Sequence, residues 1–328
     1  MKSTLDRVRI GAGLTSAYVD DREIVADGPK ALRGALADAL YDTFHTGHPR
    51  PGEAEHRSVR DPEFERLLRE RVPHRDTAAV APVEPGMPGV LRLNGVRVRV
   101  PESRLGDEVA TPAGPARHVR LPAVRPSVSP GFLLAGGSAG EGLGEGGCLR
   151  VYLGAESAEA APGLWGAVLE RLELLRLPYR AKVLSARDLH PRRDSVVVYL
   201  GPSAWQAVPE IAAAARAAGG LREDRSAYVA PLGPGAGWAW EPDDRRPGMR
   251  GLSFGEHRSH AVAAGLLACA EHGGDRAEAV REALLAAGID PDAPHRNLTS
   301  PARPFQTSGP EPGPGPREDK EGGDPHVH

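Results

Sequence analysis

The chain has 328 residues, with 41 Lys plus Arg against 44 Asp plus Glu and a net charge of -3 at pH 7. A balance so close to neutral gives no reason to expect a nucleic acid or an anionic membrane as partner. Two distant cysteines without a CxxC pair, and 12 histidines without an HExxH motif, favour neither a disulfide framework nor a metal site.

Targeting signals are the next feature that the sequence lacks. Residues 1–11 carry charges and no apolar core, so they do not resemble a signal peptide. No stretch reaches the roughly 18 apolar residues that a membrane-spanning helix needs. We therefore expect a cytoplasmic protein that does not bind membranes.

The first elements in chain order are helical. Apolar side chains recur every four residues at Leu32, Leu36, Leu40 and Phe44. This spacing predicts a helix over residues 31–44, and a similar pattern predicts a second over 61–72. We expect residues 1–80 to form an N-terminal helical segment.

The period then changes to that of strands. Asn94-Gly95 between two alternating runs predicts a hairpin over residues 90–100, with Arg97 and Arg99 on its solvated face. Residues 101–147 are rich in Pro and Gly. They predict short strands and loops, with residues 136–147 as a mobile surface loop.

The following region predicts the core of the fold. Strands are expected over 149–153, 179–184 and 195–200, and helices over 158–175, 203–218, 254–270 and 275–287. The run SVVVYL at 195–200 is apolar almost throughout, which indicates a buried central strand. The order of elements predicts an α+β fold, with a mixed β-sheet and packed helices, over residues 81–292. Residues 293–328 are expected to form a disordered tail, because Pro, Gly and charge dominate there.

Candidate site residues lie near strand ends. Arg180 and Lys182 alternate onto one face of their strand. Either both side chains point to solvent, or they form a cationic pocket in which Lys182 could act as a base. Asp194 starts the buried strand and either caps a turn or pairs with Arg192 or Arg193.

Two further segments carry arginines. Arg222 and Arg225 belong to a charged run that is either plain surface or a set of phosphate ligands. Ser253 is a good N-cap for a helix whose free amides would favour an anion. On that helix, His257 is either an exposed histidine or part of a site, and Arg258 is either an ion-pair partner or a ligand.

These segments, taken in order, resemble the HopA-type family of type III effectors and its relatives in class V lanthipeptide and thioamitide pathways. The matching stretches over about residues 30–270 are Leu40-Tyr41, Phe44-His45-Thr46-Gly47, Pro130-Gly131-Phe132, Arg150-Val151-Tyr152, Pro178 to Leu184, Arg193 to Leu200, Pro234-Gly235, Glu241-Pro242, Ser253-Phe254-Gly255 and Arg258.

The resemblance implies a role akin to that of phosphothreonine lyases, which use a lysine base and cationic phosphate ligands. In the lanthipeptide pathways, a kinase phosphorylates Ser or Thr of a precursor peptide and the lyase removes phosphate to give dehydroalanine or dehydrobutyrine. A cyclase of the same pathway would be a further partner. No metal or organic cofactor is implied.

The resemblance also implies roles for individual residues. Lys182 would be the base and His257 or Tyr228 the general acid. Asp194 and Glu241 would orient other groups, and the phosphate ligands would be Arg180, Arg222, Arg225 and Arg258. Ala230 stands where family members often have a lysine, and this favours the alternative of a non-catalytic scaffold that binds the precursor peptide, the kinase and the cyclase.

Overall fold

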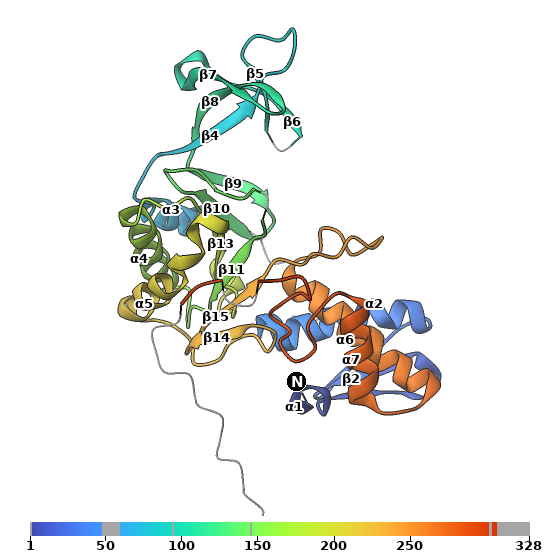
Figure 1. Ribbon diagram of the computed structural model, residues 1–328. Helices are drawn as coiled ribbons and strands as arrows, with labels where there is room; N and C mark the ends of the chain where they lie inside the picture. Colours follow the sequence, from blue (N-terminus) through green and yellow to red (C-terminus); the bar gives the residue numbers. More distant parts are fainter. Residues whose placement is uncertain (1, 48–59, 94, 145, 302–303, 307–328) are drawn as a thin grey trace, which may run out of the picture.

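The fold was analysed in a computed structural model that describes residues 2–47, 60–93, 95–144, 146–301 and 304–306 (Figure 1). Its centre is a seven-stranded sheet in the order β14-β15-β11-β13-β12-β10-β9. Together with the packed helices, it confirms the α+β class. The strands are β9 (Val124–Ser129), β10 (Phe132–Gly136), β11 (Leu149–Leu153), β12 (Arg180–Leu184), β13 (Val196–Leu200), β14 (Ala230–Gly233) and β15 (Ala236–Trp240).

The central strand is the one that the sequence predicted. β13 lies between β11 and β12, and four of its five residues are buried. The pairings within this sheet are antiparallel throughout, where the order of elements had suggested a mixed sheet. Connections between antiparallel neighbours do not require a crossover helix, so the order of strands and helices alone did not reveal the pairing.

Helices cover both faces of the sheet (Figure 1). On one face, apolar residues such as Trp165 and Val198 form a core with α3 (Pro62–Glu70), α4 (Ala161–Leu174) and α5 (Val208–Ala218). On the other face, Tyr152 and Val197 pack with α2 (Pro29–Leu40) and α6 (Phe254–His272), and α7 (Arg276–Ala286) packs on α6. Short 3-10 turns are η4 (Arg187–Leu189) and η5 (Pro202–Ala207).

The N-terminal segment differs from the prediction for residues 1–80. After α1 (Lys2–Leu5), a three-stranded sheet forms from β1 (Val8–Ile10), β2 (Ser16–Val19) and β3 (Arg22–Val25), with η1 (Ala12–Leu14) between the first two. Strands of three or four residues carry too little alternation to be recognised in a sequence. The predicted helix at 31–44 is confirmed as α2, which continues into a π-helical turn, η2 (Tyr41–Thr46).

A smaller β-region stands beyond β9 (Figure 1). It holds a three-stranded sheet of β4 (Asp76–Pro82), β8 (Gly114–Pro122) and β7 (Leu105–Thr111), with η3 (Glu102–Arg104). The predicted hairpin is confirmed as β5 (Val90–Leu93) and β6 (Val96–Arg99). The loop that follows β10 is not wholly a surface loop as predicted, because Gly137 and Gly140 are buried and Glu141 pairs with Arg125.

The predicted tail is wrong for its first part. His295 accepts a hydrogen bond from the backbone N–H of Trp240 at 2.8 Å, Asn297 is buried, and the ring of Phe305 packs against Trp238. Single side chains of this segment pack against the rest of the protein at irregular intervals. Such contacts leave no periodic pattern in the sequence. Residues 307–328 of the expected tail lie outside the described residues.

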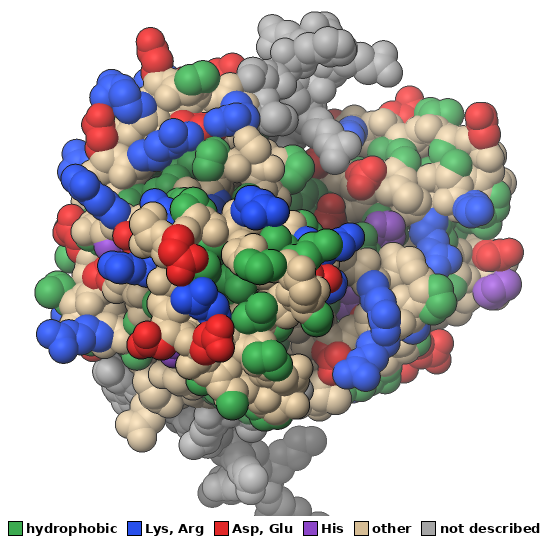
Figure 2. Space-filling view, turned by 90° about the horizontal axis from the view of Figure 1, so that it is seen from above, with side chains coloured by type: hydrophobic (Ala, Val, Ile, Leu, Met, Phe, Trp, Pro, Cys, Tyr) green, Lys and Arg blue, Asp and Glu red, His purple; other side chains and the backbone are tan. Residues whose placement is uncertain are grey.

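None of the helices within the described residues is both long enough and apolar enough to cross a membrane. On the face shown in Figure 2, basic and acidic side chains are intermingled rather than gathered by sign.

Candidate functional site

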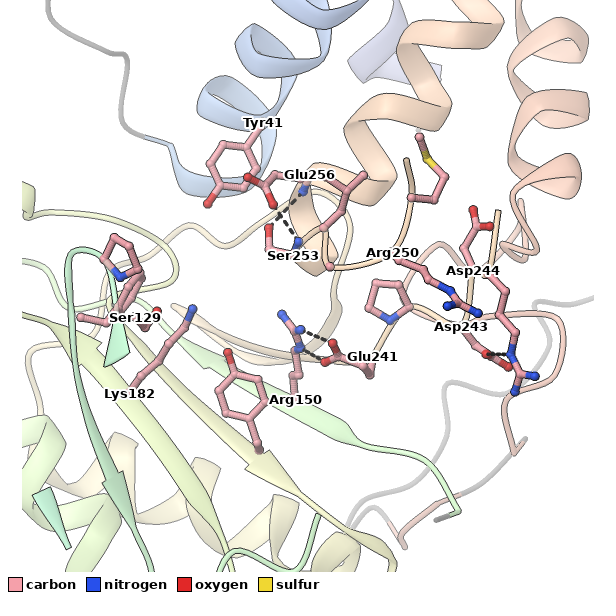
Figure 3. Close-up of a pocket in the computed structure, with 18 of the residues that line it drawn as sticks. Tyr41, Ser129, Arg150, Lys182, Glu241, Asp243, Asp244, Arg250, Ser253 and Glu256 are labelled. Carbon is pink, nitrogen blue, oxygen red and sulfur yellow. Dashed lines mark hydrogen bonds and ion pairs between the residues drawn. The ribbon is translucent and has the colours of Figure 1, made fainter. Parts of the chain in front are cut away.

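A cavity of about 820 Å³ opens over the sheet beside η2 and the start of α6 (Figure 3). Its floor is formed by side chains from four neighbouring strands: Phe132, Lys182, Tyr199 and Arg150. Its walls come from Tyr41, from Arg192, from the segment 241–252, and from Ser253 and Glu256. Figure 3 shows Lys182 and Arg150 rising from the sheet toward Tyr41, Ser253 and Glu256.

Strand register brings the floor residues together. Arg180 and Arg150 both pair with Tyr199, one from each neighbouring strand. Lys182 lies in the adjacent row, opposite Val197. Because residues two apart on a strand share a face, Arg180 and Lys182 are on the same side, as the sequence predicted. α2 and α6 cover the neighbouring part of this face, so these cations line a cavity.

Arg150 is held from one side by a carboxylate. It is 7% exposed and donates two hydrogen bonds to Glu241. It also lies 5.0 Å from the ring centroid of Tyr199. Burial disfavours the charge, but the nearby phenols and Glu241 keep the pKa of Arg150 well above its ordinary value. This guanidinium is therefore a permanent positive charge in the floor.

Arg192 is held in a similar way. Its Nε and Nη2 donate to the two carboxylate oxygens of Asp194, and Nη2 also donates to the hydroxyl of Tyr41 at 3.2 Å. Burial raises the pKa of the Tyr41 phenol, which therefore keeps its proton. The hydroxyl of Tyr41 accepts a hydrogen bond from Arg192, so its own proton is still available for donation.

Lys182 differs from these arginines. Its Nζ lies 3.9 Å from the ring centroid of Phe132 and 6.0 Å from that of Tyr199. Among the described residues, no carboxylate forms an ion pair or a hydrogen bond with it. Its amine is therefore free to meet a ligand in the cavity.

A second cavity, of about 400 Å³, continues the first along the sheet. It shares Lys182, Arg150 and Tyr199 with it and adds Arg180. The Nε of Arg180 lies 3.8 Å from Glu141. Basic side chains thus continue from Arg192 in the wall of the first cavity to Arg180 in the second.

The start of α6 has the predicted N-cap but leaves no open anion site there. The hydroxyl of Ser253 accepts from the backbone N–H of Glu256, and the carboxylate of Glu256 accepts from that of Ser253 at 2.7 Å. The capping box places a carboxylate in the wall of the cavity opposite the cations.

Two expected site residues of α6 are structural instead. His257 is 1% exposed, and its ring joins Asp244 to Arg258. Arg258 is fully buried and donates to the carbonyls of Pro294 and Arg296 and to Asn297. Neither side chain lines the cavity. A side chain's partners in the distant C-terminal segment could not be seen in the local sequence.

The remaining expected site residues, the general-acid candidate Tyr228 and the ligands Arg222 and Arg225, also lie away from the cavity. Tyr228 is buried, its hydroxyl accepts from Ser259, and burial raises its pKa to about 12. Arg222 pairs with Asp224 beside Gly154, at the far end of β11. Arg225 is exposed. These three residues therefore do not contribute to the cationic floor.

The sequence reasoning missed Arg150, Arg192, Tyr41 and Tyr199 as site residues. One signal was available for Arg150, because alternation places it and Tyr152 on one face of a strand that is otherwise apolar.

Within the described residues, no cluster of His, Cys, Asp or Glu has the geometry of a metal site.

The fold and the cavity define an α+β protein with a cationic site over an antiparallel sheet. Residues 123–296, more than half of the chain, match the HopA1 effector protein family, and the chain belongs to that family. This match includes every residue of the cavity floor.

Two solved structures resemble the chain in part. The effector protein from Pseudomonas syringae pv. syringae strain 61 is 14% identical and has a TM-score of 0.45, over 81% of this chain and 94% of that one. The effector protein from Pseudomonas syringae pv. tomato strain DC3000 is 15% identical and has a TM-score of 0.47, over 81% and 90%. No curated protein matches the chain.

Proposed function

We propose that the cavity binds a phosphoserine or phosphothreonine side chain of a ribosomal precursor peptide and eliminates its phosphate. The observation that carries this proposal is the set of basic side chains that line the cavity. Arg150 and Arg192 are each held by a carboxylate, while Lys182 has no carboxylate partner among the described residues. A phosphate monoester carries about -1.5 to -2 charges, and guanidinium groups are its preferred planar ligands.

The reaction divides the work between two kinds of group. The neutral amine of Lys182 takes the α-proton of the phosphorylated residue and becomes an ammonium, and the electron pair of that C–H bond forms the double bond between Cα and Cβ. The bond from Cβ to oxygen breaks, and phosphate leaves with its electron pair. The products are dehydroalanine or dehydrobutyrine and inorganic phosphate.

The arginines stabilise the charge that develops on the leaving phosphate. Asp194 and Glu241 orient them, which is the role that the sequence assigned to these two carboxylates. Tyr41 replaces His257 and Tyr228 as the candidate donor to the leaving oxygen, because it lines the cavity and keeps its proton. Arg180 lies next to Lys182 and Arg150 in the second cavity and would contact the peptide or the phosphate.

The natural partners in this proposal are the phosphorylated precursor peptide, its kinase and the cyclase of the pathway. The alternative is a scaffold that binds the precursor without chemistry. A specific observation favours keeping it: Ala230 supplies no cation where family members often have a lysine.

The test uses the purified full chain and a kinase-treated precursor peptide. We expect loss of phosphoric acid by mass spectrometry and capture of the product by an added thiol. Lys182→Ala should slow the elimination by about 10²–10⁴-fold, the usual contribution of a positioned base. Lys182→Arg should also lose the elimination activity, because a guanidinium stays protonated near neutral pH and cannot accept the α-proton. Lys30→Ala, at an exposed lysine of α2, is the matched control and should react like the wild type.

Arginine variants test the phosphate ligands. Arg192→Lys keeps the charge but loses the planar fork, so it should weaken binding of the phosphorylated peptide relative to the unphosphorylated one. Arg225→Lys, at an exposed site, is its control. A wild-type protein that binds both peptides equally and eliminates nothing would establish the scaffold instead.

A further inference from the structure

A third cavity, of about 930 Å³, lies in the small β-region. It runs along β4 between the β5–β6 hairpin on one side and residues 139–142 on the other. Its lining combines apolar side chains, among them Val80, Leu93, Val98 and Leu121, with the polar Arg92, His118 and Arg125. Val80 is 50% exposed, although it lies in the middle of a strand.

β4 is the edge strand of its sheet, with β8 as its neighbour there, and just past its end Val83 forms a bridge to Leu91 of β5. The backbone N–H of Ala78 points away from β8, because it donates to the carbonyl of Ser138. Residues two apart on a strand direct their backbone groups to the same edge. The N–H and C=O of Val80 therefore also face the cavity, and no described backbone group bonds to them. The edge is thus open at Val80, between the contact of Ala78 with Ser138 and the bridge of Val83 to Leu91, and such an opening can accept a short extended segment.

The cavity lies beside the cationic site, although the two share no lining residue. Glu141 bridges Arg125, in the lining of this cavity, to Arg180 beside Lys182. Arg180 pairs with Gly136, and the carbonyl of Gly136 accepts from the hydroxyl of Thr77 in β4 at 2.8 Å. Lys182 and Arg180 are two residues apart, or about 7 Å along a strand. A few residues of extended peptide would therefore connect the two sites.

We infer that the groove along β4 binds the substrate peptide beside its phosphorylated residue, as an added strand. This inference rests on the proposed function of the cationic site. The occupant is an extended segment with small or apolar side chains, which suits the lining and the hydrogen-bonding groups of Val80. Pro82, which has the same orientation on the edge but no N–H, limits the pairing to a short segment.

The test compares two synthetic peptides. The long probe has about 12 residues, roughly 40 Å when extended, with one phosphothreonine and flanks of Ala and Val. The short probe is the capped phosphothreonine with one Ala on each side. The Val80→Pro variant removes the outward N–H, and Val80→Thr keeps it as the matched control. Pro82 already occupies an equivalent position, so the strand should accept proline, and the melting temperature of each variant checks this.

We expect the long probe to bind more tightly than the short one to the wild type. Val80→Pro should weaken the long probe by about three- to tenfold, as the loss of a backbone hydrogen bond implies, and leave the short probe unchanged. Val80→Thr should bind both as the wild type does. Hydrogen exchange of the wild-type chain should show that the long probe protects the backbone N–H of Val80.

The inference is overturned if the long probe gains nothing over the short one, if Val80→Pro binds it normally, or if the backbone N–H of Val80 gains no protection. The phosphate site is judged separately. Arg192→Lys should weaken both probes when the cationic site binds phosphate. If Arg192→Lys has no effect while Val80→Pro weakens the long probe, the groove stands and the proposed function fails.

Discussion

The carboxylate of Asp194 accepts hydrogen bonds from Nε and Nη2 of Arg192 at 2.8 and 2.7 Å, in a nearly dry setting beside the cationic cavity. Burial by itself would raise the pKa of Asp194, but the guanidinium outweighs it and lowers this pKa to about 2. The pair therefore holds the guanidinium of Arg192 in place. It also makes the stability of the fold depend on pH in the acidic range.

For Asp194, the ordinary pKa is 3.8, and the folded value is lower. Its contribution to stability is thus full above about pH 4 and is lost as the pH falls toward 2. Asp194→Asn should destabilise the fold at pH 7 by about 3 kcal/mol, since it leaves Arg192 unpaired. It should also flatten the decline between pH 4 and 2. Urea unfolding at several pH values measures both effects, and an unchanged decline would contradict the assignment.

His45 should dominate a different pH range. Its buried ring contacts Ser226 at 2.8 Å, and burial, with nearby cations, lowers its pKa from 6.5 to about 4. The unfolded chain therefore takes up a proton first, and stability falls as the pH drops from about 6.5 to 4, by on the order of 3 kcal/mol. His45→Gln should remove this share of the pH dependence. The remainder includes His190 and His295, whose pKa values burial also lowers to about 4, and His257, whose pKa burial lowers as well.

Val197 tests the central strand. It is 1% exposed in the middle of β13, so Val197→Asp would bury an unpaired carboxylate. We expect little soluble protein and no cooperative melting. Val128→Asp is the matched control, because Val128 is 62% exposed on β9. A soluble Val197→Asp variant that melts cooperatively would refute the position of this strand.

The C-terminal segment can be tested by truncation. A chain that ends at Asp292 loses the contacts of His295, Asn297 and Phe305, and it leaves Arg258 without its acceptors. Its melting temperature should be lower, by more than a few degrees, than that of a chain that ends at Gln306. Equal melting temperatures would show that these contacts add no stability.

Arg258 separates a structural role from a phosphate ligand. Burial lowers its pKa to about 9, and its donors are directed to backbone carbonyls and Asn297. Arg258→Met should lower the free energy of unfolding by several kcal/mol, because it leaves buried acceptors unpaired. The preference for phosphorylated over unphosphorylated peptide should not change. A selective loss of phosphopeptide binding in a stable variant would restore it as a ligand.

Long, regular elements could be predicted from the sequence, since their patterns are local. α6 and β13 are examples, with an N-cap at Ser253 for the first and an apolar run for the second. The short strands β1 to β3 and the all-antiparallel pairing could not. Three or four residues give no clear period, and pairing between distant strands depends on tertiary contacts.

The site was predictable in part for the same reason. Lys182, Arg180, Asp194 and Glu241 do lie at or beside the cavity, because alternation and strand ends place them there. Arg150 comes from another strand of the sheet. Tyr41 comes from a segment more than 100 residues away from Lys182 in the sequence. His257 and Arg258 seemed suitable as charged groups at a helix start, yet their partners are backbone groups and Asp244.

The contacts of Arg258 have a consequence for synthesis of the chain. Its acceptors lie in residues 294–297, so they are among the last described residues to be made. A guanidinium that is buried without acceptors is costly, and α6 therefore cannot dock fully until these residues have left the ribosome. The cavity wall that begins at Ser253 would thus be completed only after all strands of the sheet have been translated. Docking of residues 294–297 is then the folding step that completes the site.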